Sequence, residues 1–153
     1  MQDALNEGRL KGDGSNPLQL TTLAKSFINA PRWSPDGKVI IFTYTQNNNQ
    51  DIYSVPADGG PLRRVTSAPS REGRPSWSRD GRSIYFYSNR TGRPEIWKIP
   101  AQGGEEIQVT TDGGHESFES PDGKLLYYED YGVKGLRSVA IADSPAPRKE
   151  PSS

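Results

Sequence analysis

Residues 30–42 read APRWSPDGKVIIF, and the pattern returns as RPSWSRDGRSIYF over residues 74–86 and as ESFESPDGKLLYY over residues 116–128. The turn glycines of the three copies, Gly37, Gly81 and Gly123, lie 44 and 42 residues apart. Two more segments keep this spacing: QDIYSVPADGG is matched by PEIWKIPAQGG and KGLRSVAIADS, and PLRRVT by EEIQVT and NPLQLT. A period of about 40–45 residues with several anchors indicates a repeat architecture.

Each repeated unit is predicted to form short strands. In residues 83–88 the alternation places Ile84 and Phe86 on one face, and residues 39–44 alternate in the same way. The Ser-Pro-Asp-Gly segment at 34–37 suits a tight connection, because proline presets the first turn position and glycine accepts a left-handed backbone. Four such strands per unit are typical of a β-propeller blade.

The order of the strands along the chain is permuted. With the strands of a blade named a to d from the axis outwards, residues 17–21 supply a leading d strand. Two complete abcd blades follow, and then the a, b and c strands of a third, with the last over residues 136–140. The predicted fold class is therefore all-β: three propeller blades in the order d-abcd-abcd-abc, or half of a six-bladed ring.

The segments WSPDGKVIIF and SNRTGRPEIWKIPAQGG resemble the repeats of the TolB-like six-bladed β-propellers, which also occur in prolyl oligopeptidase and dipeptidyl peptidase relatives and in sensor propellers of bacterial winged-helix regulators and kinases. The resemblance covers residues 15–142 and implies a bacterial binding module, in the periplasm by analogy. Two positions depart from the pattern: Glu119 stands where Trp33 and Trp77 stand, and Arg137 stands where the other units have an aromatic residue.

Three blades leave apolar faces and an unpaired strand edge exposed. Either the chain is a fragment of a longer propeller, or two copies join head to tail, each giving its 17–21 strand to the third blade of the other. The complementary ends favour the homodimer. Residues 1–13 are expected to form a loosely ordered segment, residues 14–143 the propeller segment, and residues 144–153 a disordered tail.

Composition excludes several classes of function. Lys plus Arg and Asp plus Glu number 19 each, so the basic excess of a general nucleic-acid binder is missing. There is no cysteine, which rules out thiolate metal sites and cysteine nucleophiles, and no apolar run long enough to span a membrane. The first residues carry no secretory signal, which leaves the compartment open.

The repeated tryptophans and aspartates have structural interpretations. Trp33 and Trp77 are expected to pack between adjacent blades rather than to stack on a ligand. Asp36, Asp80 and Asp122 occupy turns of three different blades, where aspartate is favoured for its backbone hydrogen bonds, so we predict no metal site and no cofactor.

The only histidine, His115, lies in a loop before the third unit. No G-x-S-x-G or H-E-x-x-H motif accompanies it, so we predict no catalytic residue and interpret it as a solvated loop residue. The alternative is contact with a partner, because the d–a and b–c loops line the face that propellers use for binding. The candidate residues on these loops carry mixed charge: Arg71, Glu72, Arg74, Arg90, Arg93, His115 and Glu116.

Three functions remain open for the chain. The first is a non-enzymatic module that binds a protein or peptide through its loop face. The second is the propeller part of a peptidase of the oligopeptidase kind, and the third is the sensor propeller of a regulator or kinase. The lack of a hydrolase motif and of a winged-helix pattern favours the first.

Overall fold

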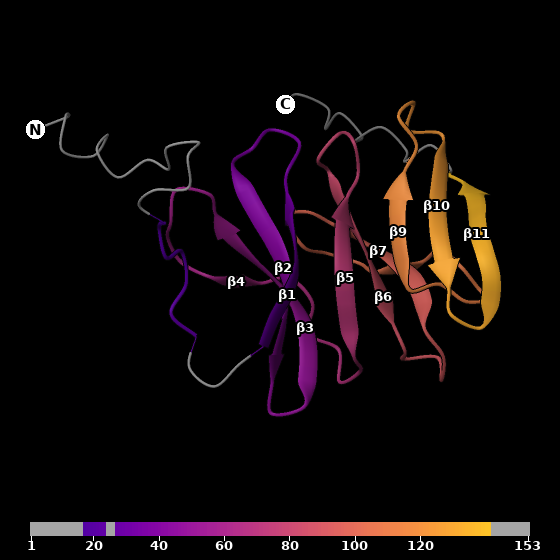
Figure 1. Cartoon of the computed structure of the whole chain (residues 1–153), viewed down its shortest axis with the longest axis horizontal. Helices are drawn as coiled ribbons and strands as arrows, with labels where there is room; N and C mark the ends of the chain where they lie inside the picture. The colour runs from indigo at the N-terminus through magenta and orange to yellow at the C-terminus, as the bar shows by residue number, and fades with distance from the viewer. Residues whose placement is uncertain (1–16, 24–26, 142–153) are drawn as a thin grey trace, which may run out of the picture.

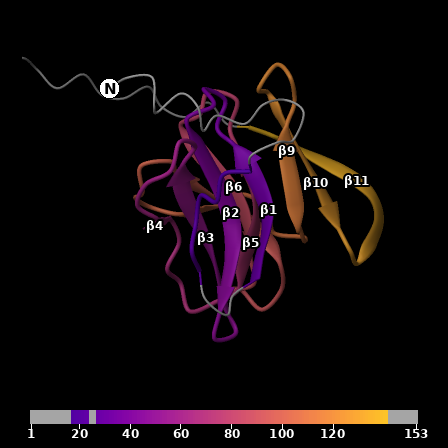
Figure 2. The same cartoon turned by 60° about the vertical axis from the view of Figure 1, so that its left-hand side comes forward.

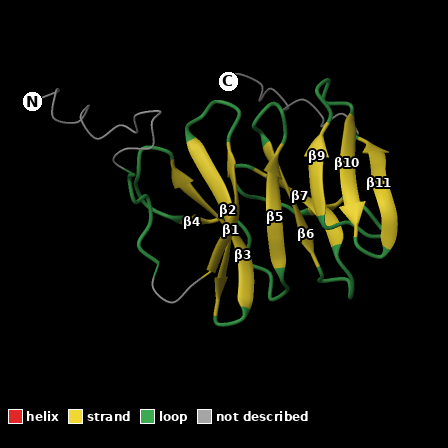
Figure 3. Ribbon diagram, in the orientation of Figure 1, coloured by secondary structure: helices red, strands yellow, loops and turns green. Residues whose placement is uncertain are grey.

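The computed structural model describes residues 17–23 and 27–141; the predicted segment 1–13 and tail 144–153 lie outside the described residues. Within the described part, the chain forms eleven strands and no helix (Figure 3). None of the described residues belongs to a helix with the length and hydropathy needed to cross a membrane. The all-β class predicted from the repeats is confirmed.

The strands form three antiparallel sheets, one for each predicted blade. The first sheet contains, in order, β1 (Phe27–Trp33), β2 (Val39–Gln46), β3 (Asn49–Pro56) and β4 (Arg63–Arg64). The second contains β5 (Glu72–Trp77), β6 (Ser83–Ser88), β7 (Glu95–Pro100) and β8 (Ile107–Gln108). The third contains β9 (Glu116–Glu119), β10 (Leu125–Asp130) and β11 (Val133–Ala140).

The three sheets follow one another in a row, with the second between the other two (Figures 1 and 2). Their first strands, β1, β5 and β9, are neighbours along this row. The alternation of β6 supplies both faces of the middle sheet: Ile84 and Phe86 pack toward the first sheet, and Tyr85 and Tyr87 toward the third. Because both faces are covered, all four side chains are buried.

The same closed turn joins the first and second strands of each sheet. In the first, Ser34 Oγ donates to Asp36 Oδ1 at 2.6 Å and accepts from the amides of Lys38 and Val39. The serine–aspartate bond returns at 2.7 Å in the second turn and at 2.6 Å in the third. These bonds are the largest cause that lowers the pKa of the aspartates, which are thus tied to their own turns. The glycine that follows has φ +70 each time.

Two predictions about the ends of the array are wrong for the single chain. Residues 17–21 form no strand, because a strand needs a neighbour and these residues lie at the opposite end of the row from β11 (Figure 1). Trp33 is 58% exposed, whereas its counterpart Trp77 packs against the cluster between the first two sheets. The described residues contain no sheet before the first that could cover Trp33.

Candidate functional site

The candidate site lies on the end of the sheets that carries the d–a and b–c connections, which we call the loop face. Its centre is a stack of three rings from three segments. The ring of His115 lies on that of Tyr87, with centroids 4.3 Å apart and planes at 16°, and the ring of Tyr131 lies against His115 at a tilt of 51°, with centroids 4.4 Å apart. Tyr131 is 67% exposed, so the stack ends at the surface.

Hydrogen bonds and packing hold His115 and Tyr87 in place. The amide of His115 donates to the carbonyl of Glu129 at 2.8 Å, which fixes the loop against β10. The hydroxyl of Tyr87 donates to Gln50 Oε1 at 3.0 Å, and the ring lies so close to Gly73 that a Cβ there would come within 2.8 Å of it. His115 is half-buried, so its interpretation as a solvated loop residue is wrong.

Protonation of His115 is expected to destabilise the fold. Burial, then the positive charge of Arg74, lowers the pKa of His115 from 6.5 to about 4, although the carboxylates of Glu116 and Asp130 act in the opposite direction. The unfolded chain therefore binds the proton at higher pH, and the stability due to the neutral ring is lost as the pH falls from about 6.5 toward about 4.

Urea unfolding at about pH 7.5 and about pH 5 tests this expectation in the wild type and in His115→Phe, which keeps an aromatic ring. The free energy of unfolding should fall more between the two values in the wild type than in the variant. Equal falls would contradict a buried, neutral His115.

Two arginines flank the stack. Arg71 donates from Nε to Gln50 Oε1 at 3.3 Å, and among the described residues no carboxylate pairs with it. Arg71 and the hydroxyl of Tyr87 donate to the same oxygen of Gln50, and Arg74 directly follows Gly73, against which the Tyr87 ring lies. The arrangement places two arginines next to the Tyr87 end of the stack.

Glu116 joins the first strands of the three sheets. Its two carboxylate oxygens accept from Arg32 on β1 at 2.8 Å and from Arg74 on β5 at 3.2 Å. The backbone of Arg74 is left-handed, with φ +49, and its amide donates to Thr43 Oγ1 at 3.0 Å. Glu116 and Arg74 are therefore as much part of the framework as of the surface.

Glu72 and Arg90 lie away from the surface that a partner would touch. Glu72 is fully buried and forms an ion pair with Arg90, which also pairs with Glu106 and lies 4.2 Å from the centroid of the Trp97 ring. Burial raises the pKa of Glu72, and the charge of Arg90 opposes this. These two candidates hold the second sheet together.

Arg93 remains at the surface. Its side chain is half-exposed and donates from Nε to the buried Glu95 at 2.8 Å. Tyr131, Tyr87 and Gln50, in contrast, were not predicted from the sequence. None of them belongs to a motif, and their role depends on three connections that meet only in the folded chain.

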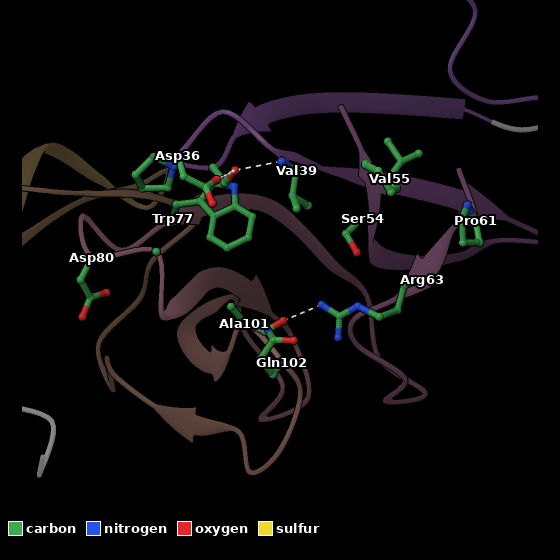
Figure 4. Close-up of a pocket in the computed structure, with 14 residues that line it drawn as sticks. Asp36, Val39, Ser54, Val55, Pro61, Arg63, Trp77, Asp80, Ala101 and Gln102 are labelled. Atoms are coloured by element: carbon green, nitrogen blue, oxygen red, sulfur yellow. Dashed lines mark hydrogen bonds between the residues drawn. The ribbon is translucent and has the colours of Figure 1, made fainter. Parts of the chain in front are cut away.

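A pocket lies on the opposite end of the sheets, which carries the closed turns and which we call the turn face. It encloses about 450 Å³ between the first two sheets, with Trp77, Pro61 and Arg63 in its wall (Figure 4). Arg63 donates across it to the carbonyl of Ala101, and Trp77 donates from Nε1 to the carbonyl of Arg32 at 3.3 Å. None of the loop-face candidates lines this pocket.

Antiparallel sheets of one repeated unit, placed face to face in an open row, define a segment of a β-propeller. Several families share the β-propeller fold, so the sequence decides to which of them the chain belongs. The model of the TolB beta propeller domain matches residues 15–147, so the chain belongs to this family, as the repeats predicted.

Solved structures agree with this assignment. The putative TolB from Agrobacterium tumefaciens is 30% identical, with a TM-score of 0.66 over 78% of this chain and 46% of that one. TolB from Acinetobacter baumannii is 27% identical, with a TM-score of 0.57 over 71% of this chain and 28% of that one. The chain thus spans less than half the length of either structure. No curated protein sequence matches it.

Propellers with other functions share the fold alone. An oligogalacturonate lyase, solved in complex with manganese, is 19% identical, with a TM-score of 0.64 over 86% of this chain and 40% of that one. At this identity the likeness concerns the arrangement of the sheets and carries no catalytic role to this chain.

Proposed function

We propose that the chain is a non-enzymatic module that binds a protein or peptide partner through its loop face. The observation that carries the proposal is the stack of Tyr87, His115 and Tyr131, which ends in an exposed ring and has Arg71 next to Tyr87 through their shared acceptor, Gln50. Aromatic rings and arginines are the residues that dominate binding energy at protein interfaces.

The chemistry of this surface favours a carboxylate on the partner, either a chain terminus or an acidic side chain. Arg71 has no carboxylate of its own among the described residues, whereas Arg74 shares Glu116 with Arg32. A guanidinium without an acidic partner can give its donors to an incoming carboxylate, and such charge-assisted bonds contribute about 1.5–3 kcal/mol.

The geometry of His115 supports binding rather than catalysis. Its Nδ1 is buried with no hydrogen-bond partner among the described residues, and two tyrosine rings lie against the imidazole, with ring centroids 4.3 and 4.4 Å from its own. A general base needs an orienting group on one nitrogen and a nucleophile at the other. The peptidase and sensor alternatives have no comparable cluster to support them in the described part of the chain.

Two pools of N-acetylated pentapeptides of random sequence test the proposal, one with free C-terminal carboxylates and one amidated. The acid pool is expected to shift the NMR signals of the Tyr131 and His115 rings at lower concentration than the amidated pool. Arg71→Gln should raise the pool concentration for half-maximal shift about tenfold, which corresponds to about 1.4 kcal/mol.

Arg79→Gln is the matched control, because Arg79 is an exposed arginine of the turn face. It should leave the shifts unchanged. Equal weakening by both substitutions, or shifts centred on Trp77 and the turn-face pocket, would contradict a partner site on the loop face.

The head-to-tail homodimer is a separate proposal. It depends on the two ends of the row of sheets and not on the loop face, so it can stand or fail independently of partner binding.

A further inference from the structure

The two ends of the row carry the two halves of an interface that the chain already forms twice. Between the first and second sheets, Ile41 and Ile52 meet Ile84, Phe86 and the ring of Trp77. The same contact returns between the second and third sheets, with Tyr85 and Ile96 against Leu126 and Tyr128. We call the face of a sheet that is turned toward the next sheet along the chain its following side, and the opposite face its preceding side. Each internal interface joins the following side of one sheet to the preceding side of the next.

The third sheet exposes the residues that its neighbours bury on the following side. Leu136 is the counterpart of Ile52 and Ile96, both fully buried, yet it is 71% exposed. Tyr127 is the counterpart of Ile41 and Tyr85, and it is 37% exposed. The position in the repeat predicts burial, and a covering sheet is what these side chains lack among the described residues.

The first sheet exposes the matching half. Trp33 on β1 is 58% exposed where Trp77 packs, and Ile28 is 41% exposed. Phe42 and Tyr44 on the same face are already buried, in a cluster to which Leu23 of the leading segment adds its side chain. The face is therefore covered at its centre and open along β1.

Among the described residues, no outer strand pairs with the edge of β11, whereas the other two sheets each have one. β3 pairs with β4, and β7 pairs with β8. In both cases a threonine follows the outer strand and accepts a hydrogen bond on Oγ1: Thr66 from the amide of Ile52 at 3.0 Å, and Thr110 from the amide of Ile96 at 2.8 Å. By the repeat, the amide of Leu136 requires the same acceptor.

The leading segment contains a threonine, Thr21, that can serve as this acceptor. Residues 16–21 repeat the outer-strand sequence, with Thr21 in the position of Thr66 and Thr110. Gln19 Nε2 donates to the carbonyl of Thr21 at 3.0 Å, and Gln108 Nε2 makes the same bond to Thr110 at 2.8 Å in the second sheet. Gln19 thus already makes the bond that its counterpart Gln108 makes in an outer strand, although residues 17–21 form no strand in the single chain.

We propose that a second copy of this chain supplies the missing strand. Residues 17–21 of each copy pair with β11 of the other, and Thr21 accepts from the amide of Leu136 across the interface. The segment of the same chain cannot do this, because it lies at the far end of the row (Figure 1). Two copies joined at both ends place six sheets in one closed ring, so no edge is left open.

The pairing register follows from the two sheets that are complete. Ser54 lies opposite Arg63 in the first sheet, and Lys98 lies opposite Ile107 in the second. The counterparts are Ser138 on β11 and Leu18 in the leading segment, both exposed in the single chain. We therefore place Leu18 of one copy opposite Ser138 of the other.

A cysteine pair tests this register directly, because the natural chain contains no cysteine. The full-length double variant Leu18→Cys/Ser138→Cys is expected to form a covalent dimer under mild oxidation, since opposed residues on paired strands lie within disulfide distance. Leu18→Cys/Ile107→Cys is the matched control and should form less than a tenth as much. Equal cross-linking of both variants would overturn the proposed pairing.

Light scattering on the unmodified chain provides the second measurement. We expect twice the mass of one chain, and Leu136→Asp should raise the dissociation constant at least tenfold. Ile107→Asp, at a position that is 59% exposed and away from the interface, should leave it unchanged while circular dichroism shows both variants folded. A monomer mass, or a series of larger masses from open head-to-tail chains, would overturn the closed dimer.

Discussion

Phe86→Ala is expected to lower the free energy of unfolding by about 3–5 kcal/mol, the range found when a buried phenylalanine is truncated. The ring is fully buried between the first and second sheets, in the same cluster as Ile41 and Ile84. Alanine removes the contacts and leaves a cavity that two sheets, each held by its own hydrogen bonds, cannot easily close. Urea unfolding at a fixed protein concentration measures the change.

Phe118→Ala is the control for this prediction. Phe118 is exposed on β9 and contacts the guanidinium of Arg32 at 5.4 Å from the ring centroid. Its truncation should cost less than about 1 kcal/mol. A small effect at Phe86, or similar effects at both positions, would show that the packing of the first two sheets does not dominate stability.

Arg90→Met is expected to destabilise the fold by about 3 kcal/mol, because it leaves the charge of Glu72 buried without its partner. The loss should also depend on pH. Burial already raises the pKa of Glu72 above 4.5, and removal of Arg90 raises it further. The difference in free energy of unfolding between variant and wild type should therefore be largest near pH 7. It should shrink as the pH falls toward about 4.5, because Glu72 then becomes protonated in the folded form of both proteins.

Arg93→Met provides the matched comparison. Arg93 also pairs with a buried acid, but Glu95 keeps two short hydrogen bonds, from Thr110 Oγ1 at 2.7 Å and from the amide of Gly113 at 3.0 Å. The hydroxyls of Ser70 and Ser88 that remain near Glu72 donate over longer distances, 3.3 and 3.4 Å. A loss below about 1 kcal/mol is expected, in keeping with a half-exposed arginine. Equal losses in the two variants would mean that Glu72 is stabilised by something other than Arg90.

The fold could be predicted because the repeat contains it several times. The alternation that places Ile84 and Phe86 on one face predicted a strand over residues 83–88, and the structure adds that Tyr85 and Tyr87 pack on the other face. The turn glycines marked the connection between the first two strands of each sheet, and their left-handed backbone is found in all three. Local patterns were sufficient here because the same local solution is used in every unit.

The burial of the repeated tryptophan could not be predicted in the same way. Trp33 occupies the same position of the repeat as Trp77, but its burial depends on a sheet that the described residues do not supply. Glu119 is the converse case: it departs from the repeat, yet it makes specific contacts in the fold. Its carboxylate accepts from the hydroxyl of Tyr85 and the amide of Arg79, both at 2.8 Å, where the other units use an indole.

The candidate site was predicted only in outline. The charged loop residues were assigned to one surface, but Glu72 and Arg90 are drawn inward by each other, across 18 residues of sequence that carry no signal of the pairing. Tyr131 and Gln50 became part of the site only through contact with His115 and Tyr87. Contacts between different units leave no period in the sequence, so they had to come from the structure.

The closed turns also bear on how such a chain changes over generations. The hydrogen bonds that Ser34 makes in the Ser34–Val39 turn all lie within a span of six residues, and the second and third turns repeat them. A duplication or deletion of one whole unit at these points would leave all of these bonds intact. Gene rearrangement can thus lengthen or shorten the array by single blades, and only the two outermost surfaces would have to adapt.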